Sequence, residues 1–308
     1  MAPAEPAGSV SFVTGADHRV FDQLFLLMGS ISRYCPGTRL LVCDFGLTQQ
    51  QQDLLRRKSI LLERPADLPG YPHAWYYKAA LGRYVSGLNT RSILWIDADM
   101  MILSDIRPLI DNLDAGMAAT GAYLAAAGNE TIGEQNAIDP APRFASLAAA
   151  FHPNARYLNS GFFLCRSATF LEDWYQLCRT MPIEKLFEQN SFNLIAHAAP
   201  DNVRIIDMLT WNMCGPQIRD AAVLASGRDI VITGPHGRTH VLHATSNAGR
   251  RDVVVRRLRL AINARVFRLT MRMFSGPEPL LAFQLDLVLD ALAENFGLLT
   301  ACGFGTNT

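Results

Sequence analysis

The spacing of apolar and polar positions changes period repeatedly along the chain. Short apolar runs that end in polar or glycine turns are typical of buried strands, and they occur at 10–17, 38–46, 59–64, 91–103, 156–166, 202–208 and 238–246. Segments with helical spacing predict helices at 21–34, 47–58, 73–88, 167–181 and 183–198. Thr48 is expected to cap the second of these helices. Because strands and helices alternate, we expect an α/β fold with a mostly parallel sheet and helices on both faces.

The composition limits the classes of protein that the chain can belong to. Its 308 residues suffice for one large α/β domain or two smaller ones, and 49% of them are hydrophobic against 18% charged, which excludes a disordered chain. Lys and Arg balance Asp and Glu at 28 each, and no nucleic-acid partner is expected. The six cysteines are scattered without a CxxC pair, which favours reduced thiols in a cytosolic protein.

No targeting or membrane-spanning segment is recognisable in the sequence. The N-terminus has neither a basic nor an apolar region of a signal peptide, and no uncharged apolar run reaches the roughly 18 residues of a spanning helix. We therefore expect a cytoplasmic protein, peripheral at most to the inner face of the cell membrane.

The hexapeptide "WIDADM" places two carboxylates, Asp97 and Asp99, just after the apolar run "SILWI". Residues at i and i+2 of an extended segment point to the same side, so the two charges repel unless a positive group lies between them. A divalent cation would remove this repulsion, and open parallel sheets bind ligands beyond the carboxyl ends of their strands. The pair thus predicts a metal that holds a diphosphate; the alternative is that one aspartate only caps a helix or turn.

Six segments occur in an order that is similar to a known family: "VSFVTGADHRVF", "YYKAALGRYV", "ILWIDADMMIL", "YLNSGFFLCR", "EQNSFNLI" and "HVLHATS". The series resembles the GT-A glycosyltransferases, most nearly the retaining family 8 type. The resemblance covers residues 9–246 and implies a Rossmann-like nucleotide-sugar-binding catalytic domain at 9–249.

The resemblance also implies roles for single residues. It implies a Mn²⁺ or Mg²⁺ ion held by Asp97, Asp99 and His243 and bridging them to the diphosphate of a UDP-sugar. The implied donor site consists of Thr14, Gly15, Ala16, Asp17, Lys78, Asp97, Ala98, Asp99, Asn159, Ser160 and Gly161. The implied catalytic residues are Glu188, Gln189 and Asn159, with Gln189 stabilising an oxocarbenium-like centre.

Other interpretations of the same residues stay open at this point. His243 can be an ordinary core or turn histidine, and residues 14–17 can form an ordinary turn between strand and helix. Gln189 and Asn193, one helical turn apart, can form a solvated polar stripe.

Two departures from the family pattern concern the chemistry. The usual "DQ" pair is Glu188-Gln189 here, which affects a contact to the sugar or acceptor. The lysine-containing stretch that follows the late histidine is replaced by "ATSNAGRR". Neutralisation of the diphosphate is then left to other bases, for which Arg250 and Arg251 are the candidates.

The segment 250–308 is expected to be a basic, amphipathic helical extension. Residues 250–273 carry eight Arg and one Asp, and helical spacing would separate an arginine face from an apolar face. One interpretation is a helix that lies on an anionic membrane. The other is a helix that folds back on the next one, where its arginines meet the acidic stripe Asp286, Asp290 and Glu294, within one chain or exchanged in a homodimer.

These features favour a metal-dependent, retaining glycosyltransferase that moves galactose or glucose from a UDP-sugar to a glycan or lipid-linked acceptor. One alternative is a GT-A transferase with another donor or with inversion, which needs a carboxylate base such as Glu188 or Asp207. The other is a non-catalytic nucleotide-sugar-binding or membrane-scaffolding protein.

Overall fold

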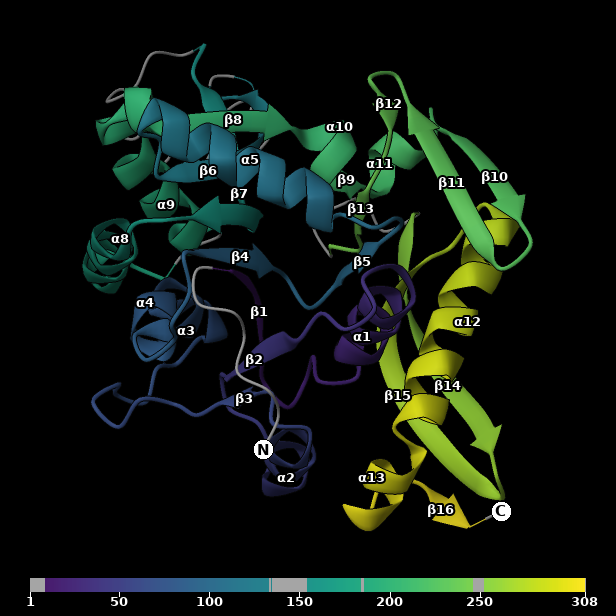
Figure 1. Cartoon of the computed structure of the whole chain (residues 1–308). Coiled ribbons are helices and arrows are strands. Elements are labelled where there is room, and N and C mark those ends of the chain that lie inside the picture. The colour runs from purple at the N-terminus through teal and green to yellow at the C-terminus, as the bar shows by residue number, and fades with distance from the viewer. Residues whose placement is uncertain (1–8, 133, 135–153, 184–185, 246–251, 308) are drawn as a thin grey trace.

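The computed structural model describes residues 9–132, 134, 154–183, 186–245 and 252–307 (Figure 1). Its centre is a seven-stranded sheet with the order β3-β2-β1-β4-β7-β6-β8. The strands are β1 (Val10–Ala16), β2 (Leu40–Asp44), β3 (Leu61–Leu62), β4 (Ser92–Ile96), β6 (Leu124–Thr131), β7 (Arg156–Cys165) and β8 (Val203–Asp207). Strands β1 to β4 are mutually parallel, β6 and β8 are parallel, and β7 runs antiparallel to both neighbours. The sheet is mostly parallel, as predicted.

Helices cover both faces of the sheet because its central strands are apolar on both sides. In β4, Ile93 and Trp95 belong to one apolar cluster, and Leu94 and Ile96 belong to another on the opposite face. The helices of the first cluster are α3 (Ala74–Ala79), α4 (Leu81–Val85), α8 (Ala168–Thr180) and α9 (Phe187–Ala198). Those of the second are α1 (Gln23–Tyr34) and α5 (Arg107–Thr120). The predicted arrangement of layers is confirmed.

Two predicted elements are each divided in the structure. The helix expected at 73–88 breaks at Ala80 into α3 and α4. The strand expected at 91–103 is interrupted at Asp97–Asp99, between β4 and β5 (Met100–Ile102). Thr48 caps α2 (Gln49–Arg57) as predicted, since its hydroxyl accepts a hydrogen bond from the backbone N–H of Gln51.

Smaller sheets lie beside the main one. β13 (Val241–His243) pairs antiparallel with β5 and parallel with β9 (Met213–Cys214). A second small sheet consists of β10 (Ala222–Ser226), β11 (Asp229–Gly234) and β12 (Gly237–Arg238). Two short helices, α10 (Met208–Trp211) and α11 (Gly215–Ile218), connect these strands to the rest. The first small sheet continues directly from the break after β4, which makes it part of the site described below.

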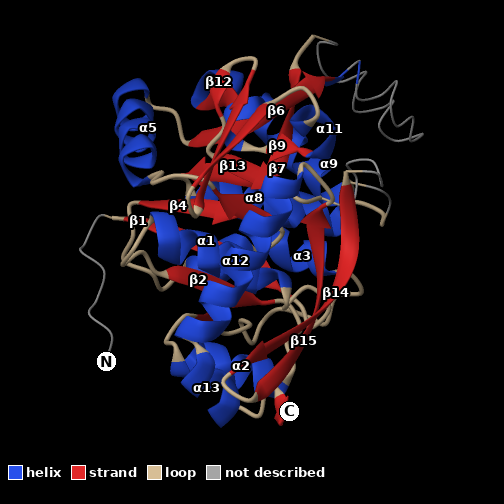
Figure 2. Ribbon diagram, turned by 90° about the vertical axis from the view of Figure 1, so that its right-hand side faces the viewer, coloured by secondary structure: helices blue, strands red, loops and turns tan. Residues whose placement is uncertain are grey.

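The prediction of a basic helix at 250–273 is wrong in the described part, residues 252–273. This segment forms a long antiparallel hairpin of β14 (Val253–Ile262) and β15 (Arg265–Phe274) (Figure 2). β16 (Thr306–Asn307) pairs with the edge of β15 (Figure 1). Asn263 and Ala264 both have positive φ, at 46° and 60°, which matches a two-residue hairpin turn. Exposed and less exposed residues alternate along β14, so Arg257 and Arg259 lie on the exposed side and Arg256 on the other, as a period of two requires.

The rest of the tail is helical, as predicted, and packs on the N-terminal half. α12 (Glu278–Glu294) lies against α1 so closely that a Cβ on Gly29 would meet the carbonyl oxygen of Leu287 at 2.2 Å. α13 (Phe296–Ala301) follows, and one apolar core joins α1, β15 and α12. Among the described residues, the acidic stripe does not pair with the tail's arginines: Asp290 pairs with Arg33 and Arg228. The division into domains at 9–249 and 250–308 stays a prediction.

The cysteines and the membrane were also the subject of predictions. All six cysteines are free thiols, and only Cys302 is not buried, which agrees with the expected reduced state. Within the described ranges, no helix has the length and apolar character needed to cross a bilayer.

Candidate active site

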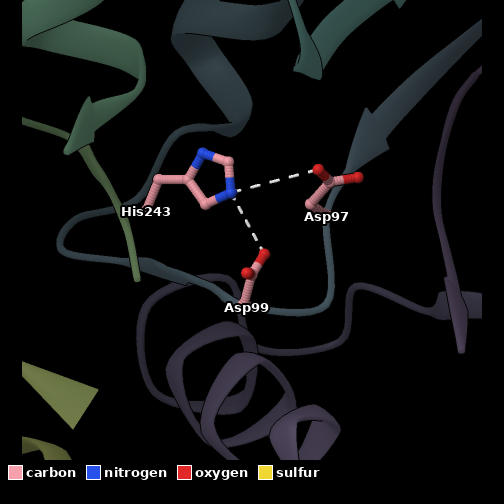
Figure 3. A group of neighbouring side chains, drawn as sticks. All are labelled: Asp97, Asp99 and His243. Carbon is pink, nitrogen blue, oxygen red and sulfur yellow. Dashed lines mark hydrogen bonds and ion pairs between the residues drawn. The ribbon is translucent and has the colours of Figure 1, made fainter. Parts of the chain in front are cut away.

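The break after β4 brings together three side chains of types that ligate metals. Asp97 and Asp99 lie between β4 and β5, and His243 on β13 is the register partner of Met100 on β5. The Nε2 atom of His243 lies 3.1 Å from Asp99 Oδ1 and 3.9 Å from Asp97 Oδ2 (Figure 3). The ligand atoms of the three residues all lie within 4.8 Å of one another. The predicted set is therefore a single cluster of side chains that could hold a metal ion, and His243 takes part in it through Nε2.

The cluster fits a divalent cation in its donor chemistry and in the orientation of its imidazole. His243 Nδ1 lies 2.8 Å from the side-chain oxygen of Asn212, which is fully buried. An amide oxygen accepts, so Nδ1 carries the proton of that bond and Nε2 points to the carboxylates, as in many metal-bound histidines. Two carboxylates with one imidazole suit Mn²⁺, and Mg²⁺ through the oxygens.

Electrostatics show that the position between the carboxylates attracts positive charge. Burial would lower the pKa of His243, but the adjacent Asp99 carboxylate outweighs burial and raises it to about 10. Burial would raise the pKa of Asp99, but His243 and Arg272 outweigh it and lower the pKa well below its usual range. A cation that binds through Nε2 would therefore displace a proton from His243.

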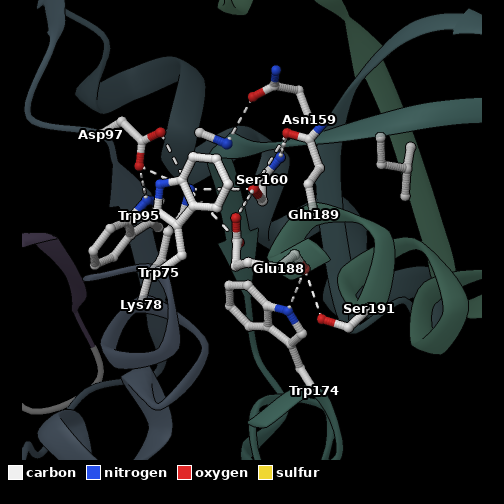
Figure 4. Close-up of polar contacts among 12 residues, drawn as sticks. Trp75, Lys78, Trp95, Asp97, Asn159, Ser160, Trp174, Glu188, Gln189 and Ser191 are labelled. Atoms are coloured by element: carbon white, nitrogen blue, oxygen red, sulfur yellow. Dashed lines mark hydrogen bonds and ion pairs between the residues drawn. The ribbon is translucent and has the colours of Figure 1, made fainter. Parts of the chain in front are cut away.

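Lys78, on α3, contacts both Asp97 of the carboxylate–histidine cluster and Glu188 of α9. Its Nζ lies 2.9 Å from Asp97 Oδ1, 3.2 Å from Ser160 Oγ and 3.8 Å from Glu188 Oε1 (Figure 4). Burial would lower its pKa, but the carboxylates of Asp97 and Glu188 outweigh burial and raise it, so Lys78 is a buried cation. Trp95 Nε1 donates to the same Asp97 carboxylate at 2.7 Å. Asp97 is thus held in one orientation.

Strand β7 and helix α9 place the predicted sugar-contacting residues next to Lys78. The backbone N–H of Ser160 donates to Gln189 Oε1 at 3.2 Å, and the Ser160 hydroxyl lies 3.3 Å from Glu188 Oε2. The side-chain oxygen of Asn159 accepts from the N–H of Gly161 at 2.7 Å. A Cβ on Gly161 would lie 2.8 Å from this oxygen and 3.0 Å from Asp97 Oδ2, so the close approach requires glycine.

The polar residues of α9 are not a solvated stripe. Glu188 and Gln189 are 4% and 8% exposed, and Asn193 is 2% exposed. Asn193 holds α9 to β7, since its amide accepts from the N–H of Leu158 at 2.7 Å and donates to the Leu158 carbonyl at 2.8 Å. These bonds fix how deeply Gln189 enters the site.

The four residues predicted to hold the nucleotide, three at the end of β1 and Asp17 directly after it, fall into two pairs. Gly15 and Asp17 line the cleft, while Thr14 and Ala16 are fully buried and do not line it, because successive strand residues point to opposite faces. Asp17 accepts from the N–H groups of Arg19 and Val20 at 2.8 and 3.2 Å. A nucleotide contact from this segment would thus come from Gly15 and Asp17.

Arg272, on β15, is a site residue that the sequence analysis missed. Its Nη1 lies 2.8 Å from Asp99 Oδ2, across 173 positions of the chain. Gln23 at the start of α1 fixes the Arg272 backbone, accepting from its N–H at 2.8 Å and donating to its carbonyl at 3.0 Å. The bases predicted for this role, Arg250 and Arg251, lie outside the described residues. No local pattern could have indicated Arg272, because the contact depends on the hairpin.

These residues surround one cleft of about 810 Å³. Gly15, Asp17, Lys78, Asp97, Ala98, Asp99, Asn159, Ser160, Glu188, Gln189, His243 and Arg272 all line it. Gly161 does not line it, and supports it from behind through the Asp97 N–H, which donates to the Gly161 carbonyl at 2.8 Å. A cleft of this size can hold a nucleotide-sized ligand.

Comparisons with known proteins agree on the fold. Neither a scan against protein-family models nor a search of curated proteins gave a match. Among solved structures, the bifunctional glycosyltransferase WbbM matches at 12% identity and a TM-score of 0.50, over 70% of this chain but only 41% of WbbM. The galactosyltransferase LgtC, solved with donor and acceptor sugar analogues, matches at 15% identity and a TM-score of 0.50, over 76% of this chain and 86% of LgtC. The chain has the GT-A fold of glycosyltransferases, as its motifs predicted.

Proposed function

We propose that this chain is a metal-dependent glycosyltransferase. It transfers a hexose, galactose or glucose, from a UDP-sugar to a glycan or lipid-linked acceptor, with retention of the anomeric configuration. The observation that carries the proposal is the cluster of Asp97, Asp99 and His243 at the cleft of a GT-A fold. The shared fold with LgtC, a galactosyltransferase, supports sugar transfer as the reaction class.

Asp97, Asp99 and His243 would hold a Mn²⁺ or Mg²⁺ ion, which when bound neutralises negative charge on a diphosphate leaving group. Lys78 and Arg272 each orient one of the two carboxylates. Arg272 is also a permanent cation at the cleft, so it supplies the positive charge that the missing lysine stretch provides in the family.

Gln189 acts by stabilising positive charge, not as a nucleophile, because an amide oxygen is barely basic. The Ser160 N–H fixes its Oε1 at 3.2 Å, and the side chain lines the cleft. The acceptor hydroxyl then attacks on the face that the leaving group departs from, and its proton passes to the departing phosphate oxygen. The fixed amide dipole of Gln189 stabilises an oxocarbenium-like centre without reorganising during the reaction.

Transfer with inversion is the second candidate, favoured by the properties of Glu188. Burial raises the pKa of Glu188 to about 7, although Lys78 acts in the opposite direction, and this value suits a general base. The other proposed base, Asp207, does not line the cleft: it caps α10 by accepting from the Thr210 N–H at 2.8 Å and contacts His236 at 2.6 Å. Glu188 would therefore be the base of an inverting reaction.

The proposal leaves the location and the assembly of the protein as predictions. The cytoplasmic location and a homodimer stay predictions. Contact of residues 250–273 with an anionic membrane was predicted for an amphipathic helix, and the hairpin in its place removes that support. The alternative of a non-catalytic scaffold is not favoured, because the cluster, Lys78 and Gln189 all line one cleft.

The experiment that tests the proposal is incubation of the purified protein with a panel of UDP-sugars and Mn²⁺, with and without glycan acceptors, followed by measurement of UDP release. We expect release with UDP-galactose or UDP-glucose that depends on Mn²⁺. If none of the UDP-sugars in the panel yields UDP, the proposed activity is contradicted. The anomeric proton signals of the product in NMR spectra then distinguish retention from inversion.

A further inference from the structure

The outward side of the β14–β15 hairpin carries an arginine at each of three successive cross-strand pairs. Starting at the active site, these pairs are Val255–Arg272, Arg257–Thr270 and Arg259–Arg268. Arg257, Arg259 and Arg268 are exposed, and Arg272 is partly exposed with its guanidinium on Asp99. We call the four arginines the arginine face.

This face continues the wall of the cleft. Val255, Thr270 and Arg272 line the cleft, and Val255 is 67% exposed. At about 3.4 Å per strand residue, Arg257 lies about 7 Å, and Arg259 and Arg268 about 14 Å, beyond the Val255–Arg272 pair. A ligand that places one end in the cleft can therefore reach the arginine face with the other.

The outer arginines lack the acidic partners that other arginines of the chain have. Within the described residues, Arg257, Arg259 and Arg268 form no ion pair, and Arg268 only donates to the Thr306 hydroxyl at 3.3 Å. The acids that the sequence would have matched to them, on α12, pair instead with Arg33 and Arg228. The positive charges of Arg257, Arg259 and Arg268 therefore lie close together on the hairpin without acidic partners among the described residues.

Two of these arginines, Arg259 and Arg268, lie directly opposite each other across the hairpin. Because the N–H and C=O of Arg272 bond to Gln23, the Val255–Arg272 pair is a non-hydrogen-bonded pair of the ladder. Arg259–Arg268 lies four positions further along and is of the same kind, with Cβ atoms about 5 Å apart. Like charges in such a pair destabilise the hairpin unless an anion binds both.

We propose that the arginine face binds a phosphate group of the acceptor, so that the substrate class of this enzyme is a phosphorylated glycan. Two opposed guanidinium groups match a phosphate, which offers three oxygens and up to two charges, better than a carboxylate. The inference rests on the proposed function, since the phosphate is placed relative to a sugar transferred in the cleft.

A membrane surface fits the face less well. The exposed residues of the hairpin's outward side include only Val255 and Ala261 as apolar side chains, and Val255 lines the cleft. The face therefore offers little to insert between lipids, and its few charges alone would bind an anionic bilayer weakly.

The test measures binding of lactose 1-phosphate and maltose 1-phosphate, each against the same sugar without phosphate, to the full chain saturated with Mn²⁺ and UDP. The bound nucleotide keeps the phosphosugar out of the donor site. Arginine Nε–H signals in NMR spectra report which side chains respond. We expect the phosphosugars to shift the signals of Arg257, Arg259 and Arg268, and the double variant R257Q/R259Q to weaken binding by about tenfold or more. The same variant should leave the affinity for UDP with Mn²⁺ unchanged.

The matched control is R57Q/R204Q, which removes two exposed arginines that form no ion pair among the described residues and lie away from the cleft. It should change phosphosugar binding less than twofold. Equal binding of sugar and phosphosugar, or equal weakening by both double variants, overturns the proposal. The proposal is also overturned if the protein binds vesicles of 70% phosphatidylcholine and 30% phosphatidylglycerol through this face but binds no phosphosugar. Failure of UDP to bind would instead contradict the proposed function, while phosphosugar binding in the same samples still tests the face.

Discussion

Replacing Glu188 with glutamine is expected to change how the stability of the protein depends on pH. Glu188 is 4% exposed, and burial raises its pKa from 4.5 to about 7 even though Lys78, 3.8 Å away, acts against this. The folded protein therefore holds a proton on Glu188 that the unfolded chain releases at lower pH. Glutamine has nearly the same shape and carries no charge at any pH.

The sign and size of the effect follow from this difference in pKa. Below pH 4.5 the carboxyl group is protonated in both states, and its contribution to stability is fully present. As the pH rises through about 7 this contribution is lost, and the loss amounts to about 3 kcal/mol. The free energy of unfolding of Glu188→Gln should thus exceed that of the wild type by about 3 kcal/mol at pH 8, and by much less at pH 5.

The assay is urea unfolding at intervals between pH 5 and pH 8, followed by circular dichroism. Glu172→Gln is the control, because hydrogen bonding to Arg83 lowers the pKa of Glu172, so its charge does not change above pH 5. The difference between this control and the wild type should stay constant over the same range. A difference for Glu188→Gln that also stays constant, or a variant less stable than the wild type at pH 8, would refute the reasoning.

Three further substitutions or truncations probe the site and the fold. Gly161→Ala inserts a methyl group 3.0 Å from Asp97 Oδ2 and should lower the free energy of unfolding by about 1–3 kcal/mol. The Mn²⁺ affinity, measured by electron paramagnetic resonance, should fall about tenfold. An unchanged Mn²⁺ affinity would contradict this expectation. Arg272→Gln removes a cation that competes with a metal ion for Asp99, so Mn²⁺ alone should bind more tightly. UDP in the presence of Mn²⁺ should bind about tenfold more weakly, as measured by calorimetry. A change of both affinities in the same direction would be inconsistent with the contact. Truncation after residue 249 removes buried Leu280, Leu287 and Leu292, each worth about 1.5–3 kcal/mol, so the fragment should show no cooperative thermal transition; a native-like melting curve would mean that 9–249 folds alone.

Local pattern was enough to predict the centre of the fold. The apolar run Ser92–Ile96 is buried on both faces, and the Asp97–Asp99 pair at its end is placed where parallel sheets bind ligands. The order of the motifs along the chain led to the prediction of His243 as the third residue of the site. No single segment reveals its contact with Asp99. The predictions that succeeded combine a short-range period with one ordered series of motifs.

The tail shows where this reasoning fails. Arginine and apolar residues at 252–273 satisfy a helical spacing over parts of the segment, but the consecutive β-branched residues Val253, Val254 and Val255 favour a strand. Asn263 between two alternating runs is the turn signal that could have indicated the hairpin. Once the hairpin was missed, the contact between Arg272 and Asp99 could not be inferred, because it joins residues that only the tertiary fold brings together.

The segment Thr14–Asp17, at the end of β1, illustrates a smaller limit. A resemblance assigns a stretch of four residues to a function, but a strand presents only alternate residues to one side. Gly15 and Asp17 reach the cleft, and Thr14 and Ala16 pack in the interior. Register, which the motif alone does not specify, decides which residues of the stretch are accessible.

The most direct test of the central claim is calorimetric titration of UDP into the protein in the presence of Mn²⁺ and, separately, of EDTA, for the wild type, His243→Gln and His240→Gln. His240 precedes β13, and its ring contacts Ser104 at 2.7 Å and does not line the cleft, so it is the matched control. We predict UDP binding that requires Mn²⁺, is lost in His243→Gln and is kept in His240→Gln. Equal UDP affinity in EDTA, or undiminished binding by His243→Gln, would contradict a nucleotide site organised around a cation on Asp97, Asp99 and His243.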